Sequence, residues 1–485
     1  MPGVWSDEVL LQRIRSHPSD AACVIGALEI GDSTSAGGGL IGRPSDQVTT
    51  AMDLSAKVRS QAVLHRAWAS VRRSGLSSTS PATQQNIKKF EADWFGNIRR
   101  IADALREGRF EFTGERGIAL PKAKGKNGHR PLVLAPVENR IVRRAILEVL
   151  QGYGDEGTRR RRWAGVPAIR HIMSTPTSVG GIPERGVPHG LMLIDQAIRD
   201  GHHWFVRSDI QNFFTRIPVR DIVAFVSSAT DDASFVALFE KALATNLTNK
   251  EELEERHLFK LFPDKQIGVA QGSALSALAG NIALRHFDQA MNGREVVCVR
   301  YIDDFTLLAT SESKAQAAYR SASALLRSMG MTAYDPDDRQ ARRLSKVDSG
   351  NIYNGTDVLG YRISGLSRQP CAAACRSLLS KLDTVVADGL RAMRTAADGP
   401  QALHFDRYHQ SQALLDNIVF GWSQSFRHTT APHVLVSLDS EIDRRIDTLT
   451  RAARELAGSA CDAQVRRRVA GVHLLADTRL VPLQT

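Results

Sequence analysis

Cysteine is scarce in this sequence, and long apolar runs are missing. Five cysteines occur in 485 residues, an odd number scattered over the chain, which argues against a disulfide framework and indicates a reducing compartment. No apolar run approaches the roughly 18 residues that a membrane-spanning helix needs. The N-terminus has neither the basic nor the apolar region of a secretory signal. We therefore expect a cytoplasmic protein that does not associate with a membrane.

The sequence does have length, a balanced composition and an excess of positive charge. Hydrophobic residues make up 42% and charged residues 24%, which is typical of soluble globular proteins. A chain of 485 residues is too long for one ordinary domain. The net charge of +11 favours a polyanionic partner. Charge alone does not separate nucleic acid from an anionic surface.

The residue pattern changes several times along the chain. Residues 1–60 contain a Gly/Ser-rich stretch, GDSTSAGGGLIGRPSD, typical of a flexible segment. Residues 61–108 show the apolar spacing of helices, for example in QAVLHRAWASVRR and IKKFEADWFGNIRRIADALREG. Short strands, turns and helices mix as far as about residue 365, and long amphipathic helices follow. This order predicts the α+β class.

Two adjacent carboxylates interrupt an apolar, β-branched run, VVCVRYIDDFTLLAT. The flanks predict two strands, with the pair Asp303 and Asp304 as the tight turn between them. A simple turn needs nothing more. A metal site is the alternative, and it needs further carboxylates from elsewhere in the chain.

A third carboxylate ends another predicted strand, in HWFVRSDIQNFFTRIP. Asp209 could be a helix cap or turn residue, or it could join the pair above. Between the two stretches lies GVAQGSALSALAGNIAL, in which Gln271 and Gly272 open a predicted helix of small residues. That helix either packs closely in the core or lets a flat base pair approach its backbone. Upstream lies a basic, hairpin-like segment, LPKAKGKNGHRPLVLAP.

Together and in this order, the four stretches resemble the reverse transcriptases. PKAKGKNGHRPL is similar to the family's fingers segment, SDIQNFF and QGSALSALAGN to its first two palm motifs, and YIDD to its YxDD box. VLGYRIS resembles the strand that grips the primer, and FGWSQSF the start of the thumb. The resemblance covers about residues 61–450. It implies a right-hand polymerase of fingers, palm and thumb.

The resemblance also implies a division of the chain. Residues 1–60 would form an N-terminal segment, and residues 61–208 the N-terminal helices and fingers. Residues 209–365 would form the palm, with some finger elements interleaved, and residues 366–485 the helical thumb and C-terminal region.

The resemblance assigns a catalytic and metal-binding role to Asp209, Asp303 and Asp304, with Ile210 as a further metal-binding position. Two Mg²⁺ ions, for which Mn²⁺ can substitute, would clamp the attacking and leaving oxygens of phosphoryl transfer. Ile302, between the strands, is expected only to pack.

Substrate contacts are implied at further positions. Arg130 would bind the triphosphate, with either Lys122 or Lys124 as its companion. Phe214 would lie beneath the ribose and exclude a 2′-hydroxyl, whereas Phe213 is expected in the core. The remaining expected contacts are Gln271 and Gly272 for the templating base and nucleotide, and Tyr301, Gly360, Tyr361, Arg140 and Arg143 for primer and template.

Some features depart from the family pattern. The fourth palm motif lacks its usual Leu-Asn pair, and Lys346 is the one candidate for its lysine. The nearest similarity is to the unknown-group and abortive-infection lineage, which is associated with defence against phage. It implies an enzyme that makes DNA from dNTPs on RNA, with a dedicated noncoding RNA as a candidate template. Two alternative functions stay open: template-independent or protein-primed DNA synthesis, and a non-catalytic nucleic-acid-binding scaffold. A homo-oligomer is also possible.

Overall fold

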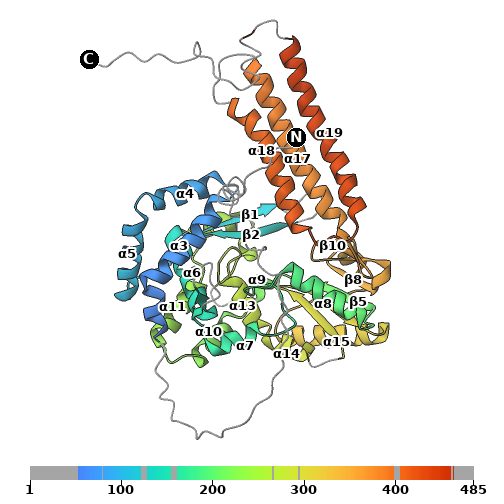
Figure 1. Ribbon diagram of the computed structural model, residues 1–485. Coiled ribbons are helices and arrows are strands. Elements are labelled where there is room, and N and C mark those ends of the chain that lie inside the picture. The colour runs from blue at the N-terminus through green and yellow to red at the C-terminus, as the bar shows by residue number, and fades with distance from the viewer. Residues whose placement is uncertain are drawn as a thin grey trace, which may run out of the picture. The chain divides into compact units, whose positions relative to one another are not determined.

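A computed structural model (Figure 1) describes residues 53–459, except for residues 79, 122–127, 155–160, 265–266, 293–294 and 398–404, and also residue 463. The chain divides into two compact units between Gly350 and Asn351. The division falls inside residues 209–365, which were predicted to form the palm. The Gly/Ser-rich stretch lies outside the described residues.

Four helices begin the first unit: α2 (Leu54–Arg59), α3 (Gln61–Leu76), α4 (Pro81–Glu91) and α5 (Trp94–Arg106). Their starts follow from the sequence, because the side chains of Ser60, Ser80 and Asp93 accept hydrogen bonds from the first-turn amides of α3, α4 and α5. The helical pattern predicted over residues 87–108 is confirmed, and it belongs to two helices. Asp93 is a capping residue, and it separates α4 from α5.

An antiparallel pair, β1 (Arg116–Pro121) and β2 (His129–Leu134), precedes the buried helix α6 (Val137–Gln151). The tip between the two strands, with Lys122 and Lys124, lies outside the described residues. Two short strands, β3 (Tyr153–Gly154) and β4 (Arg161–Trp163), and two helices, α7 (Pro167–Met173) and α8 (Val187–Arg199), follow.

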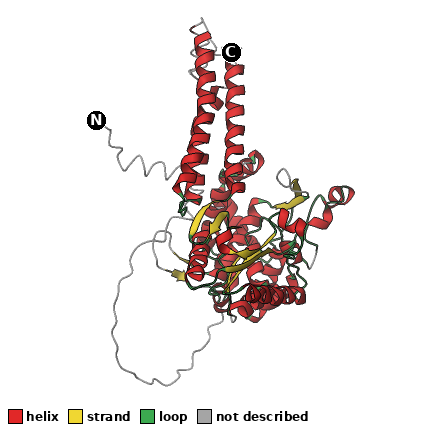
Figure 2. Cartoon of the chain, turned by 90° about the vertical axis from the view of Figure 1, so that its right-hand side faces the viewer, coloured by secondary structure: helices red, strands yellow, loops and turns green. Residues whose placement is uncertain are grey.

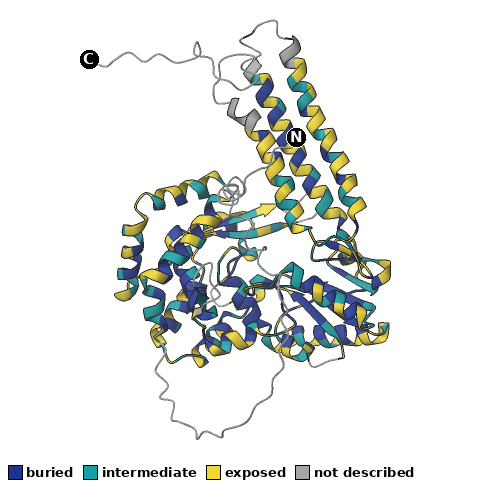
Figure 3. Ribbon diagram, viewed as in Figure 1, coloured by how far each residue is buried: buried dark blue, intermediate teal, exposed yellow. Residues whose placement is uncertain are grey.

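The first unit contains a four-stranded sheet in the order β6-β7-β5-β8. Its strands are β5 (Trp204–Asp209), β6 (Val297–Tyr301), β7 (Asp304–Ala309) and β8 (Val347–Asn351), and β7 pairs antiparallel with both β5 and β6. The intervening helices and the 3₁₀ helix η2 are α9 (Phe213–Arg216), α10 (Val219–Ser228), α11 (Ala233–Leu243), α12 (Lys250–Glu255), η2 (Phe259–Leu261), α13 (Ser276–Ala283), α14 (Arg285–Asn292), α15 (Glu312–Ser328) and α16 (Arg339–Arg343). Figure 2 shows strands of this sheet among helices, and the interior residues of β5, β6 and β7 are buried (Figure 3), whereas most of β8 is half-buried.

The second unit is built from η3 (Ile352–Asn354), a small sheet and three long helices. The sheet pairs β9 (Thr356–Val358), β10 (Tyr361–Ser364) and β11 (Ser367–Pro370), and the helices are α17 (Ala372–Ala397), α18 (Phe405–Ser425) and α19 (Pro432–Ser459). Apolar side chains of α17, among them Leu378, Leu382 and Met393, are buried together with Leu415 of α18 and Leu449 of α19. The predicted long amphipathic helices and the mixture of helix and sheet are confirmed. None of the helices in the described ranges is long and apolar enough to cross a membrane.

Candidate active site

The YIDD segment forms the turn between β6 and β7. Tyr301 and Asp304 face each other as the last residue pair of the two strands, so the turn residues are Ile302 and Asp303. The prediction that both aspartates form the turn is therefore wrong by one residue, because Asp304 begins β7. Ile302 has a φ of 60°, in a region that β-branched side chains rarely adopt. The surrounding structure must hold this turn in place.

Arg300 supplies much of that restraint. Its side chain is 0% exposed, and its Nε donates a hydrogen bond of 2.8 Å to the carboxylate of Asp288 on α14. Its Nη1 donates to the carbonyl oxygen of Ile302 at 2.8 Å, and its Nη2 donates to Asn281 on α13 at 3.0 Å. A buried guanidinium is stable only when it is paired and hydrogen-bonded in this way. Arg300 thus ties the strained residue of the turn to two helices.

A second restraint comes from the segment before α8. The Val179 amide donates to the Arg300 carbonyl oxygen at 2.8 Å. A methyl group at Gly180 would lie 2.6 Å from the Ile302 nitrogen, so only glycine permits this approach. Ile302 itself packs at the edge of the core, as expected.

The third aspartate meets the other two across the sheet. Asp209 ends β5 directly opposite Asp304 on β7, and the Ile210 amide donates to the Asp303 carbonyl oxygen at 2.9 Å. The strand pairing therefore brings Asp209, Asp303 and Asp304 together. Ile210 is linked to the turn through its backbone, and its metal-binding role stays a prediction.

The three carboxylates disturb one another electrostatically. Burial, followed by the negative charge of Asp209, raises the pKa of Asp303 to about 7. Burial also raises the pKa of Asp304 to about 6, against the opposing effect of the Arg207 charge. Carboxylates that are buried and crowded in this way favour a bound cation, because it relieves both causes of the shift.

Two buried oxygens of the site, Asp209 Oδ1 and Asp304 Oδ1, have no hydrogen-bond partner among the residues that the structure describes. Buried polar atoms are normally satisfied, and unshared carboxylate oxygens suit Mg²⁺, which prefers hard oxygen ligands. Among the described residues, no group of three or more Asp, Glu, His or Cys side chains is placed so that it could hold a metal ion by itself.

Two cations hold the other carboxylate oxygens. The Lys346 amine contacts Asp209, and Arg207 donates to Asp304 at 3.4 Å and to the Ser345 carbonyl oxygen at 2.9 Å. The Lys346 contact places that lysine at the site, whereas the sequence had only suggested it. Arg207 and Arg300 were missed by the sequence reasoning. The sequence feature that could have indicated them is a single arginine within each of two apolar strands, shortly before the motif aspartates.

The expected nucleotide contacts Arg130 and Gln271 lie side by side. The Arg130 Nε donates to the Gln271 side-chain oxygen at 3.4 Å, and the Val133 amide of β2 donates to the Gln271 carbonyl oxygen at 3.1 Å. Gly272 has a φ of 105°, where other residues are strained. The structure thus joins β2 to the loop before α13.

The helix of small residues begins later than predicted, at Ser276 and not at Gln271. Its small residues serve packing: a methyl group at Gly280 would lie 2.8 Å from the ring of Phe213. The close-packing alternative is therefore confirmed for this face of the helix, and the approach of a base pair stays a prediction.

Phe213 and Phe214 differ in burial. Phe213 is 2% exposed and lies in the core, as predicted. Phe214 is half-buried at the edge of the core, and its carbonyl oxygen accepts a hydrogen bond of 2.8 Å from the Val269 amide. Both residues belong to α9, a single helical turn, and not to a strand end. Helical geometry therefore separates their directions.

The two arginines expected along the template have different environments. Arg140 is half-buried. Arg143 is 2% exposed, forms an ion pair with the buried Glu115, and its Nε donates to the Ala242 carbonyl oxygen at 2.7 Å. The template role expected for Arg143 is not supported, because its guanidinium is used inside the fold.

The residues expected to contact the primer also differ in burial and in their contacts. Tyr301 is 38% exposed, so its ring is not a core residue. Gly360, with a φ of 86°, lies in the turn between β9 and β10. Tyr361 is buried, donates to the Ser425 carbonyl oxygen at 2.9 Å and packs on Phe426. Its predicted primer contact is not supported, because the side chain anchors the small sheet to the end of α18.

Asp209 and Asp304 on paired strands, with Asp303 in the adjoining turn, form a carboxylate cluster of the kind found in nucleic-acid polymerases. Residues 120–335 match the family described as reverse transcriptase (RNA-dependent DNA polymerase). The chain therefore carries a reverse transcriptase domain.

Two curated proteins are similar to part of the chain. The "Uncharacterized 91 kDa protein in cob intron" of Schizosaccharomyces pombe is 28% identical over 192 residues, which is 40% of this chain and 20% of that protein. "Protein YkfC" of Escherichia coli is 26% identical over 201 residues, 41% of this chain and 46% of that protein. The chain thus spans less than half the length of these relatives.

Solved structures show a distant likeness. A chain of the "Partial Cas6-RT-Cas1--Cas2 complex" is 19% identical, with 61% of this chain and 45% of that chain covered at a TM-score of 0.32. Telomerase from Candida albicans, in complex with a fragment of telomeric RNA, is 10% identical, with 81% and 71% covered at a TM-score of 0.33.

Proposed function

We propose that the protein is a Mg²⁺-dependent RNA-directed DNA polymerase that adds dNTPs to a primer on an RNA template. The observation that carries this proposal is the paired ends of β5 and β7. There Asp209 faces Asp304, and each has a buried carboxylate oxygen without a hydrogen-bond partner. The reverse transcriptase domain supplies the reaction class.

Asp209, Asp303 and Asp304 would hold the cations. Bound there, Mg²⁺ would neutralise charge on the triphosphate and favour ionisation of the attacking 3′-hydroxyl. Rigidity is the contribution of the chain: the Arg300 network fixes the turn, so the carboxylates need little rearrangement during the reaction.

Other side chains would position the nucleotide. Arg130 is exposed next to Gln271, and its guanidinium suits bidentate contact with phosphate. Burial lowers the pKa of the Lys346 amine, but the hydrogen bond to Asp209 and the charge of that carboxylate outweigh burial and raise the pKa of the amine. The amine is therefore protonated beside the site, where it can stabilise charge on the departing phosphates.

Conversion of Asp303 to asparagine tests this assignment. The Asp303→Asn and Asp209→Asn variants should lose dNTP incorporation by at least 10³-fold, a few kcal/mol of transition-state stabilisation. Both variants should still bind RNA. Primer extension with Mg²⁺ and with Mn²⁺ measures the loss, and RNA binding is the control. Near-normal extension by purified Asp303→Asn protein would contradict the proposal.

The defence role and the dedicated noncoding RNA are proposed from the resemblance of the sequence motifs alone. Sequencing the nucleic acid that copurifies with the protein, before and after dNTP addition, tests both the template and the need for one. Product that matches no copurified RNA would favour template-independent synthesis.

A further inference from the structure

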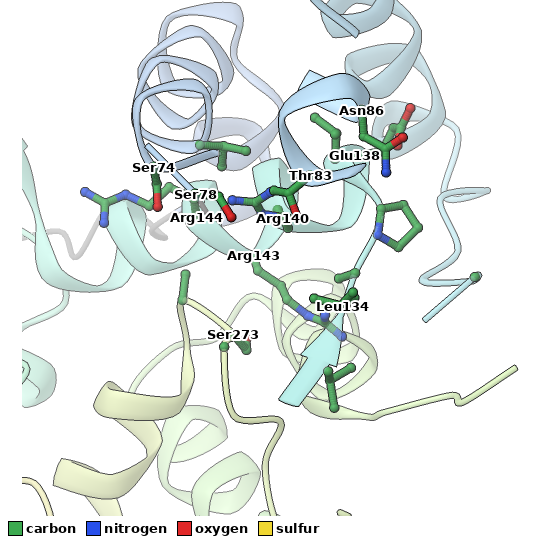
Figure 4. A pocket seen from close by; sticks show the side chains of 18 of the residues that line it. Ser74, Ser78, Thr83, Asn86, Leu134, Glu138, Arg140, Arg143, Arg144 and Ser273 are labelled. Carbon is green, nitrogen blue, oxygen red and sulfur yellow. The ribbon is translucent and has the colours of Figure 1, made fainter. Parts of the chain in front are cut away.

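Two groups of basic side chains lie in different parts of the first unit. Arg140, Arg143 and Arg144 of α6 line a cavity of about 1030 Å³ (Figure 4), and none of the active-site aspartates lines it. Arg207 and Lys346 instead contact the aspartates themselves. These two are also linked to each other, because Arg207 reaches the main chain immediately before Lys346.

Arg207 is an unusual residue for the middle of a buried strand. It is 7% exposed, its Nη1 donates a long hydrogen bond of 3.4 Å to Asp304 Oδ2, and its Nε has no partner among the described residues. A buried charge that is only partly satisfied adds little to stability, and an apolar side chain of similar size would serve the strand as well. The place of Arg207 in β5 is therefore better explained by what its guanidinium holds.

The second contact of Arg207 fixes a strained residue. Its Nη2 donates to the Ser345 carbonyl oxygen at 2.9 Å, and Ser345 has a φ of 53°, where residues other than glycine are strained. The Asp209 amide donates to the carbonyl oxygen of the next residue, Lys346, at 3.0 Å. Strand β5 thus holds Ser345 through a side chain and Lys346 through its backbone.

The next residue of β5 supports the lysine from the other face of the sheet, because consecutive side chains of a strand point to opposite faces. Ser208 Oγ accepts a hydrogen bond of 3.0 Å from the Tyr334 amide, and the Tyr319 hydroxyl donates to the Tyr334 carbonyl oxygen at 2.6 Å. The Lys346 amine lies 5.7 Å from the centre of the Tyr334 ring, within the range of a cation–π contact. Two neighbouring residues of one strand therefore restrict the amine to the vicinity of Asp209.

We propose that Arg207 is a positioning residue, which fixes the Lys346 amine relative to Asp209 and Asp304 by joining Asp304 and the Ser345 main chain through one guanidinium. The inference rests on the proposed function and deepens it, because it names what places the cationic group that meets the departing phosphates. Arg207 also puts a positive charge beside Asp304, where it opposes a bound cation. Its loss should therefore tighten metal binding and slow turnover, whereas the loss of a merely structural residue would weaken both.

The chemical reactivity of Lys346 tests its placement without metal or nucleotide. The full-length protein is treated briefly with acetic anhydride in EDTA, and peptide mass spectrometry measures the acetylation rate of each lysine. An amine that is held against a carboxylate and a ring reacts more slowly than a free one, so Arg207→Gln should raise the rate at Lys346 at least threefold. The rate at exposed Lys88 should not change. Arg199→Gln is the matched control, because Arg199 is exposed on α8 and its substitution removes the same charge.

Metal binding and turnover give the second readout. In a Mn²⁺ titration followed by electron paramagnetic resonance, without nucleotide and at about pH 8.5, Arg207→Gln should bind Mn²⁺ about threefold more tightly than the wild type. Arg207→Lys keeps the charge and should bind Mn²⁺ with wild-type affinity. Both variants should lower turnover in primer extension about tenfold, with less than a twofold change in KM for dNTP. A lysine amine lacks the fork that reaches Asp304 and Ser345 together.

A double variant connects Arg207 with Lys346. Lys346→Gln should slow turnover by itself. If Arg207 acts through the lysine, Arg207→Lys combined with Lys346→Gln should turn over no more slowly than Lys346→Gln alone. Losses that multiply in the double variant would mean that the two residues act independently, and would overturn the inference.

The outcomes separate this inference from the proposed function. Unchanged acetylation of Lys346 in folded Arg207→Gln protein would overturn the inference even if the polymerase assignment held. Weaker Mn²⁺ binding in that variant would reduce Arg207 to a structural residue and also overturn it. Thermal unfolding establishes folding, and if Arg207→Gln does not fold, Arg207→Lys decides, since it should show the same gain in Lys346 acetylation. Near-normal polymerisation by Asp303→Asn would contradict the proposed function alone, because the acetylation result depends on neither metal nor turnover.

Discussion

At the scale of single residues, the pKa values of Asp303 and Asp304 depart most from those of ordinary carboxyl groups. The pKa of Asp303 is about 7 and that of Asp304 about 6, both above the ordinary value near 3.9. A carboxyl group whose pKa is raised by folding stabilises the fold at pH values below its unfolded pKa. That stabilisation is lost as the pH rises through the folded pKa.

Metal-free protein should therefore become less stable between about pH 4 and pH 7, that is, between the unfolded and the folded pKa values of the two carboxyl groups. Asp303→Asn should flatten this decline and stabilise the metal-free fold at the alkaline end, on the order of 2 kcal/mol after allowance for partial exposure. Urea unfolding in EDTA at both ends of the range measures it. Exposed Asp231→Asn is the control, and equal profiles for the two variants would refute the idea.

The phenylalanine pair gives a second prediction at this scale. Phe214→Ala should admit ribonucleotides with a modest loss of dNTP use, if its half-buried ring meets the ribose. Phe213→Ala should instead lower the free energy of unfolding by about 3–5 kcal/mol, because its ring is buried against α13. Competition between rNTP and dNTP in primer extension decides between them. Unchanged sugar discrimination in Phe214→Ala would remove this residue as the gate.

At the scale of elements, the sequence predicted the strands and helices better than the side-chain contacts that hold the catalytic turn in place. The strands around Asp209 and the DD pair were predictable, because apolar β-branched runs end at the aspartates. The long C-terminal helices followed from their periodicity. The supports were not predictable, since Arg300, Asp288 and Asn281 lie on β6, α14 and α13 and meet only in the folded chain. Tyr361 and Arg143 were misjudged for the same reason: burial depends on tertiary contacts.

The β6–β7 turn should depend on Arg300 for its geometry. Arg300→Lys keeps the charge but loses the fork that reaches Asp288 and Ile302 together. It should raise the Mg²⁺ concentration for half-maximal extension severalfold and lower the turnover rate, with little change in KM for dNTP. Arg300→Met leaves Asp288 unpaired and should cost about 3–5 kcal/mol of stability. A folded Arg300→Lys protein with an unchanged Mg²⁺ response would limit Arg300 to a packing role.

At the scale of the whole molecule, positive charge is the dominant feature. With a net charge of +11, RNA binding should release counterions and weaken steeply with salt. Four phosphate contacts at about −0.7 each predict roughly a 50-fold loss of affinity for a fourfold rise in salt. Binding isotherms over a salt series measure the slope. Substituting a lysine or arginine that makes one of these contacts should make the slope shallower by about 0.7, whereas an unchanged slope would show that the substituted residue makes none.

The left-handed conformation of Ile302 has a consequence for how the first unit folds. An unfolded chain rarely visits that conformation at isoleucine, so the β6–β7 hairpin gains little from forming alone. The hairpin is held in place by the Val179 amide and the Asp288 carboxylate, which both bind Arg300. Val179 lies far upstream in the chain, before α8, and Asp288 lies on α14, the helix before β6. We expect the hairpin to close late, after α14 and the segment before α8 have docked. The catalytic turn would then be among the last parts of the domain to gain protection from hydrogen exchange.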